Sequence, residues 1–201
     1  MKSFYDQSRL ERILLEELYS RIYTYDIKYY HSLLEGYDTH DSVVLRFEKD
    51  SPKLRDTHIY EAKIRDRNYP SILLEKKKLL GLIRYSKRYK TGPVSIFYVS
   101  SHPEATWVFK LSQNLKDYNW IKETHNVSTR EMYRGTTIKE ITYLDIKDAK
   151  RVDIKSTDIE KIDDEKEKEK KIENVVKNQL QTLCLYEFLT KKDDGYETDN
   201  G

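Results

Sequence analysis

The order of apolar patterns along this chain predicts an α/β fold. Residues 8–22 repeat apolar side chains at helical spacing, whereas 42–48 and 57–65 have the composition and alternation of strands. A second helical pattern at 71–90 is followed by two apolar strands, at 94–99 and 106–111. With 201 residues, of which 37% are hydrophobic, the chain can build one such domain and carry less densely packed appendages.

The first helical segment carries a carboxylate on its apolar face. The face is formed by Leu10, Ile13, Leu14 and Leu18, and Glu17 falls inside it at about 100° per residue. Two explanations are open, because Arg21 lies four residues further on and can pair with Glu17. Otherwise the carboxylate faces a functional site.

The next two strands bring three charged side chains together. Asp41 opens the first strand, and the second carries Glu61 and Lys63 on one face, because side chains alternate along a strand. Two carboxylates can hold Mg²⁺ or Mn²⁺ and leave room for water and a phosphate, while the lysine stabilises developing negative charge. Asp56 competes with Asp41, but its odd spacing from Glu61 places it on the other face.

An acid at the start of one strand and Glu-x-Lys on the next resembles the PD-(D/E)xK nuclease superfamily, which has the restriction-endonuclease-like fold. Thr39 and His40 stand before Asp41, where the family has a proline. The resemblance covers about residues 8–112 and implies a three-layer α/β/α core with a mixed central sheet. It further implies that Asp41 and Glu61 bind the metal, that Lys63 assists the attacking water, and that the product is a 5′-phosphate.

Two further site residues are implied by the same resemblance. The superfamily often has a glutamate on its first helix, for which Glu17 is the candidate. The helix after Glu-x-Lys often lends a polar residue, for which Lys76 is the first candidate and Glu75 the second. The alternative for Lys76 is that its stem lies along the core while its charge stays in water.

The sequence around Glu61 distinguishes its acid-x-Lys triplet from triplets that occur by chance. Eight acid-x-Lys triplets occur in this chain, in which 36% of residues are charged. Only the triplet at Glu61 is followed by a helix and two strands, which is the order in the superfamily core. The triplet at Asp145 lies in a strand-like run, but charged low-complexity sequence follows it.

A net charge of +2 conceals a basic middle and an acidic end. Residues 61–90 contain six Lys and four Arg against three acids, whereas residues 156–201 contain eight Lys against thirteen acids. A concentrated positive charge attracts the phosphates of nucleic acid. We expect DNA contacts from Arg65, Arg67, Lys87, Arg88 and Lys90, although the last three can also form a plain solvated helix face. Arg130 and Arg134 could likewise contact DNA, or their segment could cover the edge of the sheet.

Three parts are predicted. Residues 1–112 form the nuclease-like core, 113–155 a loop-rich appendage with one strand that packs on the core, and 156–201 a charged tail. The tail is expected to be helical at about 172–189 and disordered at 190–201. Its helical part could dock on the core, pair with another copy in a homodimer, or bind a protein partner.

The composition also restricts the location of the protein. Cys184 is the single cysteine, which excludes an intrachain disulfide and a multi-cysteine zinc site. No apolar run approaches membrane-spanning length, so we expect no membrane partner. These features predict a soluble protein of a reducing cytoplasm, which is the host cytoplasm if this is a phage protein.

Two function classes follow from these patterns. The first is a metal-dependent DNA nuclease in phage recombination, repair or junction resolution, whose cofactor is Mg²⁺ or Mn²⁺. The alternative is a non-catalytic protein of the same fold, such as a phage virion component or a partner-binding scaffold. The arrangement of Glu17, Asp41, Glu61 and Lys63 in space separates the two classes.

Overall fold

The computed structural model describes residues 4–23, 28–33, 40–48, 53–90, 92–126 and 135–170. The chain divides into two compact units, residues 1–160 and residues 161–201. Within the described ranges, no helix is both long enough and apolar enough to cross a membrane.

A six-stranded mixed sheet forms the centre of the first unit. Its strand order is β1-β2-β3-β5-β6-β9, and every neighbouring pair is antiparallel except β3 and β5, which are parallel. The bounds are Lys28–Leu33 for β1, Ser42–Phe47 for β2, Leu54–Ile64 for β3, Val94–Ser101 for β5, Thr106–Leu111 for β6 and Lys150–Val152 for β9.

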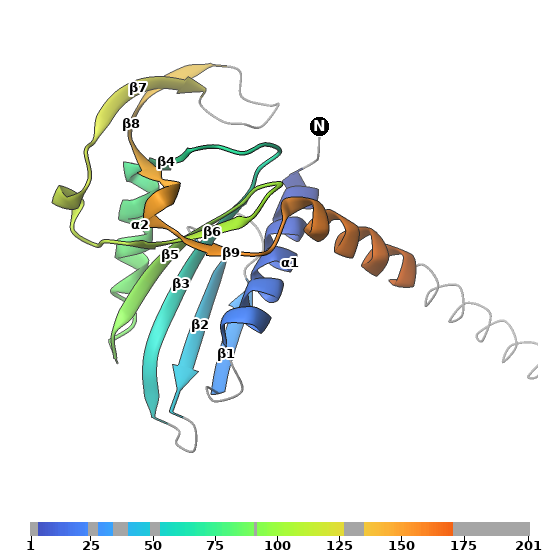
Figure 1. Cartoon of the computed structure of the whole chain (residues 1–201). Helices are drawn as coiled ribbons and strands as arrows, with labels where there is room; N and C mark the ends of the chain where they lie inside the picture. Colours follow the sequence, from blue (N-terminus) through green and yellow to red (C-terminus); the bar gives the residue numbers. More distant parts are fainter. Residues whose placement is uncertain are drawn as a thin grey trace, which may run out of the picture. The chain divides into compact units, whose positions relative to one another are not determined.

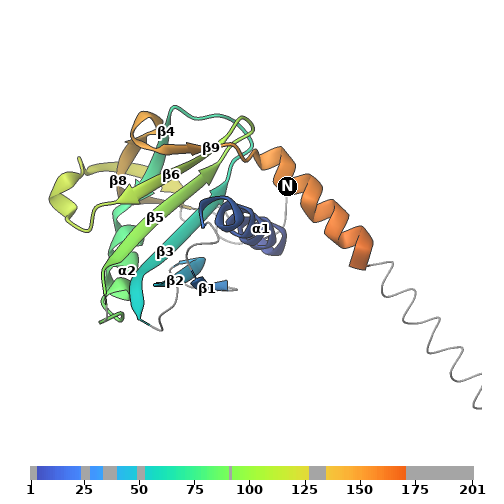
Figure 2. The ribbon, with the colours of Figure 1, turned by 60° about the horizontal axis from the view of Figure 1, so that its bottom comes forward.

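One helix covers each face of this sheet (Figures 1 and 2). Helix α1, Phe4–Ile22, places Tyr19 against Tyr60 of β3, with the ring centroids 5.2 Å apart. Helix α2, Lys76–Ser86, packs on the opposite face, where its buried Leu79 and Leu82 share a hydrophobic cluster with Ile59. The predicted α/β fold with a mixed central sheet is therefore confirmed.

The segment at 71–75 is a strand, so the prediction of one helix from 71 to 90 was wrong at its start. Strand β4, Ser71–Glu75, pairs with β8, Thr136–Asp145, which also pairs with β7, Ile121–Asn126. These three strands form a second sheet. Ile72 and Leu74 alternate into the core with 2% and 1% exposure, and this tertiary pairing outweighs the local helical pattern.

The helix also ends earlier than predicted, at Ser86. Its buried face contains Leu79 and Leu82, whereas Leu80 is 40% exposed. The crossover from β3 through α2 to β5 places the start of α2 at the carboxyl end of β3. The parallel pairing of β3 with β5 requires this direction.

Residues 113–155 are more regular than expected. They contain β7, β8 and β9, together with two short 3₁₀ turns, Leu115–Asp117 and Ile146–Asp148. Strand β9 adds to the edge of the main sheet, with Thr106 opposite Val152. The predicted boundary at residue 112 therefore lies inside the fold, because later residues complete both sheets.

A helix spans residues 156–170, and its first turn belongs to the first unit. Ser156 donates its backbone N–H to the carbonyl of His102 at 2.9 Å, and Ile159 is 0% exposed. The tail predicted from residue 156 thus begins five residues later, at Lys161. The expected helix at 172–189 and the expected disorder at 190–201 lie outside the described residues.

Candidate active site

Asp41 and Glu61 are neighbours across the β2–β3 pair. The paired register ends with Ser42 opposite Tyr60, and the backbone N–H of Asp41 donates to the carbonyl of Tyr60 at 2.9 Å, which holds Asp41 at the end of this pairing, next to Glu61. Beyond Ser42, β3 has no β2 partner for its backbone N–H groups. The Asp41 carboxylate accepts from the N–H of Ala62 at 2.6 Å, which fixes its position beside Glu61.

Two lysines and a second glutamate complete a buried charged cluster. Lys63 Nζ lies 3.3 Å from Oε1 of Glu61 and 3.0 Å from Oε1 of Glu11, which α1 contributes. Lys78 Nζ, from α2, lies 2.7 Å from Oε2 of Glu61. Three elements therefore converge on Glu61, whose side chain is only 1% exposed. We call Glu11, Asp41, Glu61, Lys63 and Lys78 the charged cluster.

Burial and mutual repulsion dominate the electrostatics of the carboxylates. The pKa of Glu11 is raised to about 7. Burial is the main cause, the attraction of Lys63 opposes it, and the charge of Asp41 acts in the same direction as burial. Burial and Asp41 also raise the pKa of Glu61, although Lys63 and Lys78 oppose them. Burial alone would lower the pKa of Lys63, but Glu61, Asp41 and Glu11 raise it instead.

The donor set of the charged cluster suits a hard divalent cation in its chemistry, since such ions take carboxylate oxygens. Oε2 of Glu61 is buried, and Lys78 approaches it without the directionality of a hydrogen bond. The carboxylate oxygens of Glu11 and Glu61, however, lie against the ammonium groups of Lys63 and Lys78. Across the described part of the chain, no three His, Cys, Asp or Glu side chains form a group arranged to hold a metal ion.

The first helix contributes Glu11 to the cluster, not the predicted Glu17. The two residues are six positions apart, which displaces them by about 9 Å along the helix and about 120° around it. Arg21, the alternative partner of Glu17, donates instead to the carbonyl of Asp153 at 2.7 Å. Glu11 could have been found from the sequence, because it shares the spacing i, i+3, i+4, i+7 with Leu14, Leu15 and Leu18.

The second helix contributes Lys78, and the predicted Lys76 and Glu75 pair with β8 instead. Lys76 Nζ lies 2.9 Å from Glu140, and Glu75 accepts from Lys139 at 2.7 Å. Their assignment to the site assumed a helix that began at 71. Lys78 lies one turn before the buried Leu82, on the helix that α2 forms.

The predicted DNA contacts fall at two separate places. Arg65 and Arg67 directly follow β3, next to the charged cluster, and Arg65 also donates to the hydroxyl of Tyr98 at 3.4 Å. Lys87, Arg88 and Lys90 follow the other end of α2 and are exposed. Arg130 and Arg134 lie outside the described residues.

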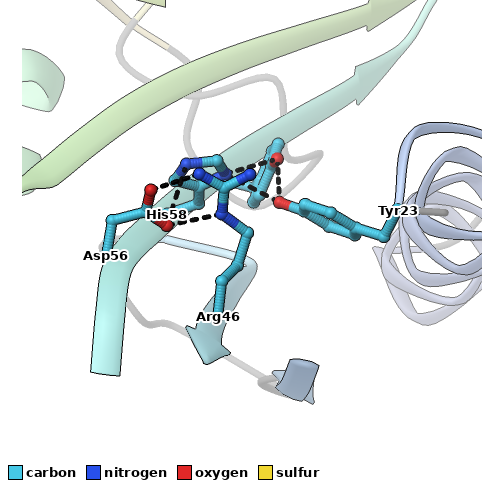
Figure 3. A network of polar contacts seen from close by, with 5 residues as sticks. Tyr23, Arg46, Asp56 and His58 are labelled. Atoms are coloured by element: carbon cyan, nitrogen blue, oxygen red, sulfur yellow. Dashed lines mark hydrogen bonds and ion pairs between the residues drawn. The ribbon is translucent and has the colours of Figure 1, made fainter. Parts of the chain in front are cut away.

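A second polar network lies at the other end of β3 and on its other face (Figure 3). Arg46 binds both carboxylate oxygens of Asp56, and the Tyr23 hydroxyl lies 2.7 Å from Nδ1 of His58 and 2.6 Å from the Tyr60 hydroxyl. Burial and Arg46 lower the pKa of His58 to about 4, so the ring is neutral near pH 7. Asp56 thus faces away from Glu61, as its odd spacing predicted.

This tyrosine–histidine network joins α1 to the sheet. A neutral His58 accepts at Nδ1 from Tyr23, and Tyr23 can in turn accept from Tyr60. Tyr23 and Tyr60 are 7% and 1% exposed, and their hydroxyls contact each other and His58. The network therefore connects the end of the helix to the sheet.

Comparison of the chain with protein-family models, with curated proteins and with solved structures gave no match. The interpretation of the charged cluster therefore depends on its own geometry and chemistry.

Proposed function

We propose that this protein is a metal-dependent nuclease that hydrolyses phosphodiester bonds in DNA. The observation that carries the proposal is the charged cluster, in which the carboxylates of Asp41 and Glu61 interact at the end of the β2–β3 pairing, with Lys63 against Glu61. Three carboxylates there face two ammonium groups, so the fully ionised cluster retains a net negative charge. Added positive charge would relieve the repulsion that raises the pKa of Glu11.

Each residue has a role in this proposal. Asp41 and Glu61 would hold Mg²⁺ or Mn²⁺, with Glu11 in the place that the resemblance gives to a helix glutamate. The ion would polarise the phosphate and lower the pKa of an attacking water. Lys63 places its ammonium where negative charge develops on the phosphate, and Lys78 balances the charge of Glu61.

A DNA substrate is supported by the cations around the cluster. Arg67 is exposed, and it follows Lys63 by four residues. The phosphates of a bound strand would be attracted to such side chains in a salt-dependent manner. Recombination, repair and junction resolution are the processes that use this class of enzyme.

A second function is favoured by one observation. Both oxygens of Glu61 have a lysine within 3.3 Å, so Glu61 itself is paired as in a structural ion network. In that case the chain is a non-catalytic binding or scaffold protein that has the same fold. Its working part would then be a surface, such as the acidic C-terminal region, that contacts a protein partner.

A cleavage assay separates the two functions. The wild type and the variants Asp41→Ala, Glu61→Ala, Lys63→Ala and Asp56→Ala would be incubated with plasmid, linear, single-stranded and branched DNA. We expect cleavage with Mg²⁺ or Mn²⁺, little with Ca²⁺, and none with EDTA. Asp41→Ala and Glu61→Ala should abolish it, and Lys63→Ala should lower the rate by roughly 10²-fold or more.

Asp56→Ala is the matched control, because Asp56 is an acid of the same strand that faces the other way and binds Arg46. It should retain cleavage in any sample whose circular dichroism shows a folded protein. Loss of activity in Asp56→Ala alone would move the site to the second network. If the wild type cuts none of the substrates with any of the metals, the scaffold function replaces the nuclease.

A further inference from the structure

Exposed positive charge is concentrated at the end of the sheet opposite the charged cluster. Five exposed cations gather there: Arg55, Arg84, Lys87, Arg88 and Lys90. Among the described residues, none of the five forms an ion pair with a carboxylate. From residue 76 to residue 103 the sequence contains seven Lys and Arg and no acid. We call these five side chains the basic end.

Backbone contacts bring the basic end together. The chain leaves α2 at Ser86 and reaches β5 through a turn in which Gly92 has a φ of 79°. A Cβ on Gly92 would lie 3.3 Å from the carbonyl oxygen of Arg55, so the turn packs directly on β3 at that residue. The N–H of Thr57 also donates to the carbonyl of Pro93 at 2.9 Å. The residues after α2 are thus held beside Arg55.

Two acids among the described residues at this end are each paired with a cation. Asp56 is bound by Arg46 through both oxygens, and Glu48 lies 3.3 Å from Lys53. Arg88 lies over the ring of Tyr85, with 4.9 Å between its Cζ and the ring centroid, and so keeps an ordered guanidinium at the surface. A row of exposed, unpaired cations around an aromatic anchor fits a polyanion with regularly spaced charges.

The basic end and the charged cluster are separated by a defined length. Arg55 and Glu61 are six residues apart on one strand, which corresponds to about 20 Å. Lys78 and Arg88 are ten residues apart in and just after α2, about 15 Å if helical. At 3.4 Å per base pair, about 20 Å corresponds to roughly six base pairs.

We infer that the basic end is a second phosphate-binding surface, and that the substrate is duplex nucleic acid that extends at least about four to six base pairs beyond the reacting phosphate. The duplex lies along the α2 side of the molecule, with one part at the charged cluster and another at the basic end. This inference adds a minimum substrate length to the proposed nuclease. It rests on the proposed function, because that function identifies the charged cluster as the place where the phosphate reacts.

The test is a binding measurement with Ca²⁺ in place of Mg²⁺, because we expect little cleavage with Ca²⁺ while the charged cluster keeps its cation. Fluorescence anisotropy would give the affinity of the wild type and of K87E/R88E/K90E for duplexes of 8 and 24 base pairs. A long duplex occupies both surfaces, so the variant should lose at least about tenfold in affinity at 100 mM salt. A short duplex can use either surface, so its loss should stay below about threefold. The slope of log K against log salt should fall by about 2.7, or about 0.9 for each lost contact.

Two further variants keep the test independent of folding and of net charge. K116E/K147E/K150E makes the same change of charge at exposed lysines elsewhere and should bind the long duplex like the wild type. K87Q/R88Q/K90Q avoids acids at the end of α2 and should reproduce the direction of the loss. The second surface would be overturned if the control variant lost as much affinity for the long duplex as K87E/R88E/K90E. It would also be overturned if K87E/R88E/K90E lost equal affinity for short and long duplexes, or bound both like the wild type. Binding of anionic phosphatidylserine vesicles through the same residues, as tightly as the long duplex, would also overturn it.

The outcomes distinguish this inference from the proposed function. If the long duplex needs the basic end and no DNA is ever cut, the surface stands and the nuclease falls. If DNA is cut and K87E/R88E/K90E binds like the wild type, the nuclease stands and the surface falls.

Discussion

Glu11 is a residue whose ionisation opposes folding. Its pKa in the folded protein is about 7, above the ordinary value of 4.5, so the folded state binds more protons than the unfolded state between these values. The stabilisation from this extra proton is fully present below about pH 4.5. It is lost as the pH rises through about 7, and burial is the main cause.

Glu11→Gln should therefore stabilise the metal-free protein at pH 8 by up to roughly 3 kcal/mol, because the amide never ionises. The advantage should shrink toward pH 4.5, where the wild-type carboxyl is protonated in both states. Urea unfolding of both proteins between pH 5 and pH 8 measures it. Glu17→Gln, at a residue of the same helix outside the charged cluster, is the control for the substitution itself. An E11Q protein that is less stable than the wild type at pH 8 would contradict the prediction.

The identity of the helix glutamate shows where residue-level prediction failed. Both Glu11 and Glu17 fall near the apolar face of α1, and the sequence alone gives no position of the helix along β3. Packing of Tyr19 on Tyr60 sets that position, and it brings the first half of the helix to Lys63. Asp41, Glu61 and Lys63 were predictable because strand alternation and a hairpin register are local properties.

At the scale of elements, the tyrosine–histidine network fastens the end of α1 to β3. Tyr23→Phe removes a hydroxyl that contacts both His58 and Tyr60 in a buried setting. We expect a loss of about 1–3 kcal/mol in the free energy of unfolding, because His58 Nδ1 is left with only the Tyr60 hydroxyl at 3.3 Å. Urea denaturation at pH 7 measures the loss.

Tyr89→Phe provides the comparison for this effect. Its hydroxyl contacts only Tyr85, at 3.2 Å, in a partly buried setting, so its removal should cost well under 1 kcal/mol. If the two variants were equally stable, the network would be no stronger than an ordinary surface contact between tyrosines.

The start of α2 shows why element boundaries limit the prediction of a site. The apolar pattern at 71–90 predicted one helix, and the resemblance then made Lys76 the first candidate on that helix. Pairing with β8, a strand about seventy residues later, converts 71–75 into β4 and moves the helical face to Lys78. No local pattern contains that information, because the partner strand is distant in sequence.

At the scale of the whole molecule, the first unit ends inside a helix. Ile159 is fully buried and Ser156 donates to His102, whereas the residues from Lys161 belong to the second unit. Deleting 161–201 should leave the free energy of unfolding of the first unit nearly unchanged. Deleting 156–201 should cost roughly 2–5 kcal/mol, the usual cost of losing a buried Ile side chain.

Thermal melts of the two truncated proteins test this boundary. A common melting temperature would show that the turn at 156–160 contributes nothing to stability, and loss of the transition in both proteins would show that the second unit is integral to the first.

The overall order of helix, strands, helix and strands was predictable, because each element has its own apolar pattern. The second sheet was not, since β4 and β7 are recognisable only through β8.

Strand β3 serves both polar clusters, with Asp56, His58 and Tyr60 on one face and Glu61 and Lys63 on the other. The number of residues in β3 is therefore more tightly constrained than the identity of most of them. Loss or gain of one residue between His58 and Glu61 would turn every later side chain to the wrong face and dismantle the charged cluster. Evolution can thus substitute residues along this strand far more freely than it can insert or delete them, and natural variation in length should be confined to its ends.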